Sequence, residues 1–201
     1  MQFKLILVFH LLTYYMKKII LFGFAGLGLL AACKNPFSKK PTNDEVIKKA
    51  ATMPGVNAGS GNFDIETPAG WVRMDTSMSG LQTTLLLSTV AANGFRSNVN
   101  VITQAMSGMA GDAYFDANLA VMSREMEGFK VIEKGAKDIN GLPAHFVHYT
   151  ALNGARTLEQ ELYIIPSGNI AYLVTCTSLP GRMAKDQATF DQAVSSFKIH
   201  Q

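Results

Sequence analysis

The sequence has few of the residues from which disulfide scaffolds and hydrolase sites are built. Its 201 residues include only two cysteines, which could form at most one disulfide, so a disulfide-rich scaffold is excluded. No Gly-x-Ser-x-Gly motif occurs, and the nucleophile turn of an α/β-hydrolase is therefore missing. We expect no catalytic residue, no metal site and no cofactor, and hence a protein that is not an enzyme.

The one close pair of histidines does not predict a metal site. His145 and His148 lie three residues apart in a predicted strand, so their side chains should point to opposite faces. No cysteine or acid joins them at a spacing typical of metal ligands. We expect one histidine at the surface and one packed on the sheet. Cys176, in the apolar stretch YLVTCTS, is predicted to be a buried thiol that packs like a small hydrophobic residue.

Basic charge is in excess only near the N-terminus. The chain has 18 basic and 15 acidic residues, but Lys4, Lys17 and Lys18 precede Cys33, where there is no acid. Without these three lysines, 15 basic residues balance 15 acidic ones. Nucleic-acid binding needs a basic patch on the folded part of a protein. We therefore expect no nucleic acid among the partners.

Residues 16–33 have the pattern of a bacterial secretion signal. They read MKKIILFGFAGLGLLAAC, which is two lysines, an apolar run and then small residues. The apolar run, 19–32, is short for a bilayer-spanning helix, which needs about 20 residues. We predict that residues 1–32 are a signal peptide, with the true start at Met16 because a second apolar run precedes it. The alternative is an N-terminal transmembrane helix with Cys33 as an ordinary thiol.

The end of this segment, Leu30, Ala31, Ala32 and Cys33, resembles the lipobox of bacterial lipoproteins. The resemblance implies that the signal peptidase recognises the three residues before the cysteine. It also implies that the Cys33 thiol carries a diacylglyceryl group and that the new amino group is acylated, typically with palmitate. Several acyl chains make membrane anchoring stable, where one chain would be marginal. The expected location is the bacterial cell envelope. In a Gram-negative cell, the lysine after the cysteine implies the outer membrane, facing the periplasm.

Residues 33–60 are predicted to be the lipidated N-terminus and a flexible basic tether. They contain proline, serine, glycine and lysine, with little apolar periodicity. Five lysines against two acids give residues 34–60 a net charge of +3. Such a tether would be weakly attracted to an anionic membrane surface, or its charge is simply that of a solvated linker.

From residue 61 the pattern changes to short strands and two helices. Period-two alternation predicts strands near residue 63 and at 71–74, 81–90, 96–106, 129–139, 142–152, 156–166 and 169–179. Asn140-Gly141, Asn153-Gly154 and Ser167-Gly168 predict three successive hairpins. Helical spacing predicts helices at 112–127 and 184–196. Residues 61–201 should thus form one α+β domain, an antiparallel sheet of six to seven strands flanked by two main helices.

Three stretches of this domain resemble the PsbP-like superfamily. They are FDIETPAGW (63–71), SNVNV (97–101) and SSFKI (195–199). The resemblance implies a PsbP-like sandwich, with a central antiparallel sheet flanked by helices. Within the superfamily, the DcrB-like members are the closer analogues because they are also lipidated envelope proteins. The resemblance implies protein binding and no particular reaction.

Three residues are candidates for a functional cleft. Trp71 follows a Pro-Ala-Gly turn and could stack on a ligand or fix the edge of the core. Asn98 and Asn100 alternate on one strand face, and could line a polar cleft or hold a neighbouring loop. Two functions stay open. The first is a membrane-anchored, non-catalytic adaptor that binds another envelope protein. The second is a small-ligand carrier or weak hydrolase that uses a cleft near Trp71 and Asn98.

Overall fold

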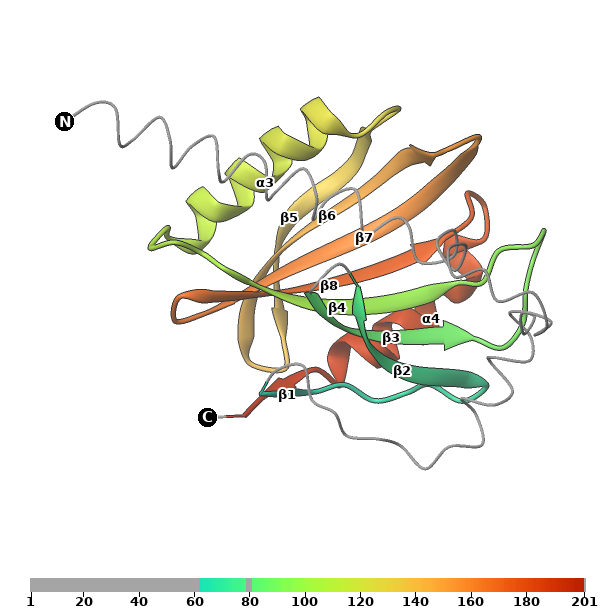
Figure 1. Ribbon diagram of the computed structural model, residues 1–201, viewed down its shortest axis with the longest axis horizontal. Coiled ribbons are helices and arrows are strands. Elements are labelled where there is room, and N and C mark those ends of the chain that lie inside the picture. The colour runs from blue at the N-terminus through green and yellow to red at the C-terminus, as the bar shows by residue number, and fades with distance from the viewer. Residues whose placement is uncertain (1–61, 79–80, 201) are drawn as a thin grey trace, which may run out of the picture.

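The computed structural model describes residues 62–78 and 81–200, which form a seven-stranded antiparallel sheet with two helices (Figure 1). The strand order is β2-β3-β4-β8-β7-β6-β5, and a short β1-β9 pair forms a second sheet. The elements are β1 (Phe63–Asp64), β2 (Trp71–Met78), β3 (Leu81–Ser88), β4 (Asn98–Ala105), α3 (Gly111–Glu125), β5 (Lys130–Ile139), β6 (Leu142–Asn153), β7 (Arg156–Ser167), β8 (Ile170–Ser178), α4 (Met183–Ser195) and β9 (Lys198–Ile199). The predicted signal peptide, Cys33 and the tether all lie outside the described residues.

The structure confirms the predicted α+β class, the three hairpins and both helices. At the β5–β6 turn, Asn140 and Gly141 have φ values of 54° and 82°, which a two-residue turn of this type requires. The strand predicted at 71–74 was too short, since β2 continues to Met78. Its second half is polar and carries little strand signal. Pairing with β3, from Trp71 opposite Ser88 to Met78 opposite Leu81, extends it.

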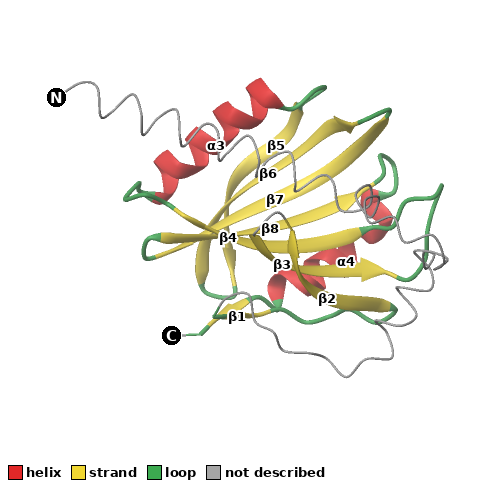
Figure 2. Ribbon diagram, in the orientation of Figure 1, coloured by secondary structure: helices red, strands yellow, loops and turns green. Residues whose placement is uncertain are grey.

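The two helices cover opposite faces of the sheet (Figure 2). We call these the α3 face and the α4 face. Successive side chains of a strand point to opposite faces, so each strand contributes to both. On the α4 face, Val99, Val174 and Phe190 are 0% exposed and belong to the larger core cluster. On the α3 face, Phe115 and Met122 of the helix pack with strand residues such as Val147 in a second cluster. Neither helix is long and apolar enough to cross a membrane, among the residues described.

A partly buried carboxylate fixes α4 to the sheet. Asp186, in the first turn of α4, accepts hydrogen bonds at Oδ2 from Ser97 Oγ at 2.5 Å and Ser178 Oγ at 2.7 Å. Arg182 Nε donates to the same oxygen at 3.1 Å. Ser97 and Ser178 are only 2% and 0% exposed, so their hydroxyl groups depend on partners within the protein. Asp186 therefore joins the approach to β4, the end of β8 and the start of α4.

Replacing Asp186 with alanine should destabilise the domain. Two buried hydroxyl groups would lose their charged acceptor, and we expect the free energy of unfolding to fall by about 2–3 kcal/mol. Urea unfolding would measure the loss. Asp191→Ala is the matched control, because this exposed carboxylate on the same helix accepts one hydrogen bond, from Gln187. The control should change stability by less than about 0.5 kcal/mol. Equal losses in the two variants would contradict a clamp at Asp186.

Candidate functional site

A strip of uncharged polar side chains crosses three neighbouring strands on the α3 face. Asn98 of β4 is opposite Thr177 of β8, and Thr177 is opposite Gln160 of β7. Two residues further along β4, Asn100 is opposite Thr175 of β8. We call these five residues the polar strip. The sequence singled out the two asparagines and missed the other three.

The alternation of the strands places these residues on one face. In β4 the two asparagines flank Val99, which faces the α4 core and is 0% exposed. In β8 the two threonines flank Cys176, which is also 0% exposed and faces α4. Each strand thus buries an apolar set under α4 and turns its polar set to the α3 face.

Gln160 is the most buried member of the strip, at 1% exposure. Its Nε2 donates a hydrogen bond to Thr177 Oγ1 at 3.0 Å. Its Oε1 is buried and has no hydrogen-bond partner among the described residues. A buried polar atom without a partner costs a protein about 1–3 kcal/mol, and few native groups are left in this state. The oxygen is thus an acceptor that lacks a donor.

The strip is flanked mainly by apolar side chains. Two arginines lie beyond one end of it, because Arg156 of β7 shares the α3 face four residues before Gln160 and Arg96 precedes Asn98 by two residues. Leu87 and Leu85 of β3 lie opposite Asn98 and Asn100. On the other side, Gln160 is opposite Tyr149 of β6. The register of the strands and the alternation of their side chains show which residues lie on the α3 face. On β2, β3, β4 and β8, none of these residues is charged.

Trp71 and Asn98 do not share a cleft. Trp71 faces α4, where its ring meets Phe190 edge to face, with centroids 5.9 Å apart and an interplanar angle of 80°. Asn98 faces the opposite side of the sheet, and its Nδ2 donates to the carbonyl oxygen of Arg96 at 3.2 Å. Strand β3 lies between β2 and β4, so its register decides whether Trp71 and Asn98 point to the same side of the sheet. The sequence pattern does not specify this register. The prediction that Trp71 and Asn98 line one cleft is therefore wrong.

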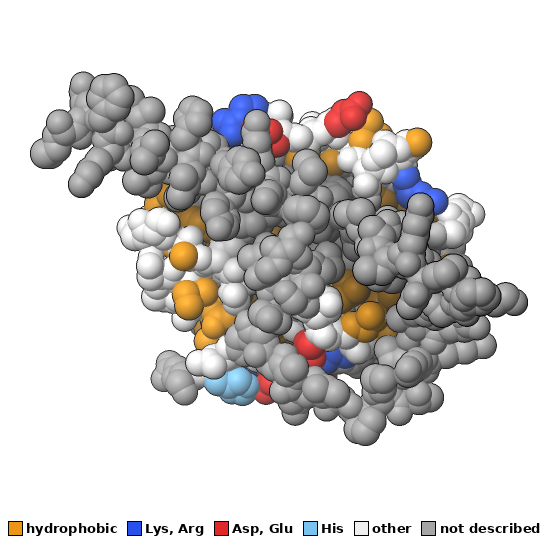
Figure 3. All heavy atoms as spheres, in the orientation of Figure 1, with side chains coloured by type: hydrophobic (Ala, Val, Ile, Leu, Met, Phe, Trp, Pro, Cys, Tyr) orange, Lys and Arg blue, Asp and Glu red, His pale blue; other side chains and the backbone are white. Residues whose placement is uncertain are grey.

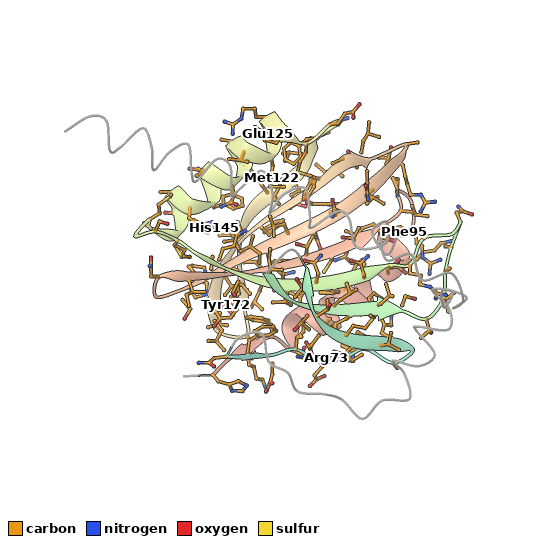
Figure 4. The ribbon with its side chains drawn as sticks, viewed as in Figure 1. Arg73, Phe95, Met122, Glu125, His145 and Tyr172 are labelled. Atoms are coloured by element: carbon orange, nitrogen blue, oxygen red, sulfur yellow. The ribbon has the colours of Figure 1, made fainter. Side chains whose placement is uncertain are left out.

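The two central histidines point to opposite faces, as predicted. His145 stacks on Phe115 of α3 with centroids 5.0 Å apart, and its Nε2 lies 2.8 Å from Asp112 Oδ1. In Figure 4, His145 and Met122 lie between α3 and the sheet, whereas Arg73 lies at the β2 edge. His148 Nε2 lies 2.9 Å from Glu159 Oε1. Both side chains are partly buried, at 23% and 19% exposure, so neither is a fully exposed surface histidine.

Metal-binding side chains do not gather in the described part of the chain. No group of three or more histidine, cysteine, aspartate or glutamate residues there is arranged to hold a metal ion. The third described histidine, His200, lies at the C-terminal end with Nε2 2.8 Å from Asp64 Oδ2. Each described histidine therefore has its own carboxylate, at a separate place.

Cys176 is buried, as predicted, and chemically protected. Burial raises the pKa of its thiol well above the ordinary value, and the negative charges of Glu161 and Asp191 raise it further. Lys137 acts in the opposite direction but more weakly. Because the thiolate is the reactive form, this thiol should be inert in the folded protein.

Comparison with known proteins supports the fold. The DcrB family model matches residues 64–196. Among solved structures, LpqN of Mycobacterium tuberculosis, described as involved in cell envelope biogenesis, is 13% identical, with a TM-score of 0.57 over 82% of this chain and 100% of its own. The cyanobacterial PsbP of Synechocystis is 16% identical, with a TM-score of 0.50 over 86% of this chain and 100% of its own.

A third similar structure is the Pseudomonas aeruginosa protein PA94, of unknown function. It is 15% identical, with a TM-score of 0.55 over 64% of this chain and 98% of its own. No curated protein matches the sequence significantly. At these identities the structural likenesses show the fold, and they confirm the PsbP-like resemblance seen in the sequence.

Alkylation should distinguish the buried thiol of Cys176 from a reactive one. In a Cys33→Ser variant, Cys176 is the only thiol in the chain. We expect no labelling by iodoacetamide under native conditions at neutral pH and complete labelling in urea, because the thiol is buried and its pKa is raised. Mass spectrometry would follow the reaction. Rapid labelling of the folded variant would contradict this assignment.

Proposed function

The chain belongs to the DcrB family, and on that premise we propose that it is a lipid-anchored adaptor of the bacterial cell envelope. It binds another envelope protein and catalyses no reaction. The lipobox-like sequence that ends at Cys33 supports the anchor, although it lies outside the described residues. The envelope role described for the similar protein LpqN supports the location. In a Gram-negative cell the protein would sit on the outer membrane and face the periplasm.

The observation that carries the adaptor proposal is the edge strand β5. Its ten residues, Lys130–Ile139, pair with β6 on one side, and no described strand pairs with the other. Eight of the ten side chains are exposed. An edge strand offers unpaired backbone N–H and C=O groups, to which a partner can add a strand of its own. This surface therefore fits an extended segment of another protein.

An apolar contact lies at one end of this edge. The register of β5 against β6 shifts between Val131 and Glu133, which marks a bulge. At this bulge the side chains of Val131 and Ile132 are 40% and 53% exposed. A partner strand that ends at the bulge would gain hydrophobic contact with both side chains.

The charge along β5 favours a selective partner. Three lysines, at 130, 134 and 137, and two acids, Glu133 and Asp138, lie among its exposed positions, so the strand carries a net charge of +1. Lysine on an edge strand discourages pairing between two copies of the same protein. Acidic side chains on a partner strand would instead be attracted. We therefore expect the partner to bring an acidic, extended segment.

Nothing in the adaptor proposal requires reaction chemistry from the described residues. Their three histidines bind separate carboxylates, on Asp112, Glu159 and Asp64, and so form no shared centre. The second function open from the sequence, a carrier or weak hydrolase near Trp71 and Asn98, loses its geometric basis because the two residues face opposite sides of the sheet.

The anchor is tested by the mass of the mature protein. Expressed in a Gram-negative host, the native chain should begin at Cys33 and exceed the peptide mass by a diacylglyceryl group and one acyl chain. Cys33→Ser should lack the lipid and leave the membrane fraction, because its attachment depends on the acyl chains. A membrane-bound native protein that retains residues 16–32 and carries no lipid would instead support the transmembrane alternative.

The adaptor role is tested by photo-crosslinking in intact cells. A photoreactive amino acid at Ile132 should give one defined adduct with another envelope protein, and the adduct should depend on Cys33. The matched control is Val90, an apolar residue in the β3–β4 connection that is 63% exposed. Adducts of equal yield at the two positions, or none at Ile132, would contradict a partner site at β5.

A further inference from the structure

We propose that the polar strip is a binding site for a small neutral amphiphile, whose hydroxyl or amide group donates a hydrogen bond to Gln160 Oε1. The strip lies on β4, β8 and β7, away from the edge strand β5. The site is therefore independent of the proposed adaptor surface, and either can exist without the other.

The unpartnered oxygen of Gln160 defines the first requirement of the ligand. The amide is held in place because its nitrogen donates to Thr177 Oγ1 at 3.0 Å. Its oxygen is then left with no donor among the described residues. A ligand N–H or O–H group would complete this pair and remove the desolvation cost that the buried oxygen imposes.

The dimensions of the strip define the second requirement. Neighbouring strands are about 4.8 Å apart, so Asn98 and Gln160, two strands apart, are separated by about 10 Å. Two residues along a strand add about 7 Å, which is the step from Asn98 to Asn100. A head group with two or three hydroxyl or amide groups fits this area. The side-chain amide of Asn100 and the hydroxyl of Thr175 are then available to its remaining polar atoms.

The absence of charge on the strands around the strip defines the third requirement. All five residues of the strip are amides or hydroxyls, and β2, β3, β4 and β8 add no charged side chain to this face. Figure 3 views this side of the molecule, where the visible described surface is mostly hydrophobic or uncharged but also includes charged side chains. A charged head group would lose its hydration without a counter-charge on the strip itself, which is costly. Arg96 and Arg156, beyond one end of the strip, already donate to the backbone carbonyl oxygens of residues 88, 89 and 93. The site therefore selects neutral ligands.

Apolar side chains next to the strip accept the apolar part of the ligand. Leu85, which is partly exposed, is opposite Asn100 across the β3–β4 pair. It belongs to a small cluster with Val72 and Leu87 that is separate from the cores under the helices. Helix α3 packs mainly on β6 and β7, and Tyr114 near its start also donates a hydrogen bond to Gln104 of β4 (Figure 2). A short apolar chain would thus lie along β3, where Leu85 and Leu87 face the same side of the sheet as the strip.

The proposal is tested with two probes that share one tail. Calorimetric titration of the purified full chain with 1-monooctanoylglycerol below its aggregation concentration should show saturable binding. Octanoate has the same eight-carbon tail but a charged head, and should bind at least about tenfold more weakly because the strip offers no counter-charge. Binding of both probes with equal affinity would indicate nonspecific apolar contact and overturn the proposal.

Two variants test the assignment to Gln160. Gln160→Met keeps the side-chain length and removes the acceptor, and should weaken binding of the neutral probe about tenfold, the equivalent of one hydrogen bond. Gln187→Met is the matched control, because Gln187 lies on α4 and donates to Glu161 and Asp191. It should leave the affinity unchanged. Far-ultraviolet circular dichroism would confirm that both variants fold.

A second position keeps the test independent of Gln160. Asn100→Leu should also weaken binding of the neutral probe, because it removes the other buried amide of the strip. No saturable binding of 1-monooctanoylglycerol, or native affinity in both Gln160→Met and Asn100→Leu, would overturn the proposal. The titration uses purified protein without an envelope partner, so its failure would leave the adaptor proposal unaffected. A failure of the photo-crosslinking experiment would likewise leave the proposed ligand site unaffected.

Discussion

The structure depends on the strict alternation of side chains in its central strands. The strands β4, β8 and β7 are covered by α4 on one face and partly by α3 on the other, so a shift by one residue would exchange the two sets of side chains. Val99 and Val174 would then leave the α4 core, and Asn100 and Thr175 would enter it. Burying these polar groups among apolar side chains would be costly. The alternation therefore fixes the register, and the register in turn gathers the polar strip on one face.

A single carboxylate supports this register at the end of the strands. Asp186 binds Ser97 and Ser178, which reach it from the approach to β4 and the end of β8. Hydrogen bonds to a charged acceptor are stronger than those between neutral groups. The helix is thereby held at one position along the sheet, with Phe190 over the core. Packing and polar contacts thus favour the same arrangement on the α4 face. On the α3 face the unpartnered oxygen of Gln160 is the exception, and for that reason it suggests a function.

Much of the fold could be predicted from the sequence because its signals are local. Asn140-Gly141 requires a tight hairpin, and the spacing of Phe115, Met122 and their neighbours requires a helix. The candidate site could be predicted only in part. Alternation within one strand placed Asn98 and Asn100 on the same face, but Gln160 lies about 60 residues further along the chain. Only the register of β8 between β4 and β7 brings it beside them. Trp71 was assigned to their side for the same reason, since no local pattern relates β2 to β4.

We infer that Gln160 is kept for binding rather than for stability. The free energy of unfolding of Gln160→Met, measured by urea denaturation without ligand, tests this most directly. The substitution removes an unpaired buried oxygen together with one hydrogen bond to Thr177, and these changes offset each other. We expect a variant at least as stable as the native protein. A loss of about 2 kcal/mol or more would show that the amide is a satisfied structural group and not one kept for binding.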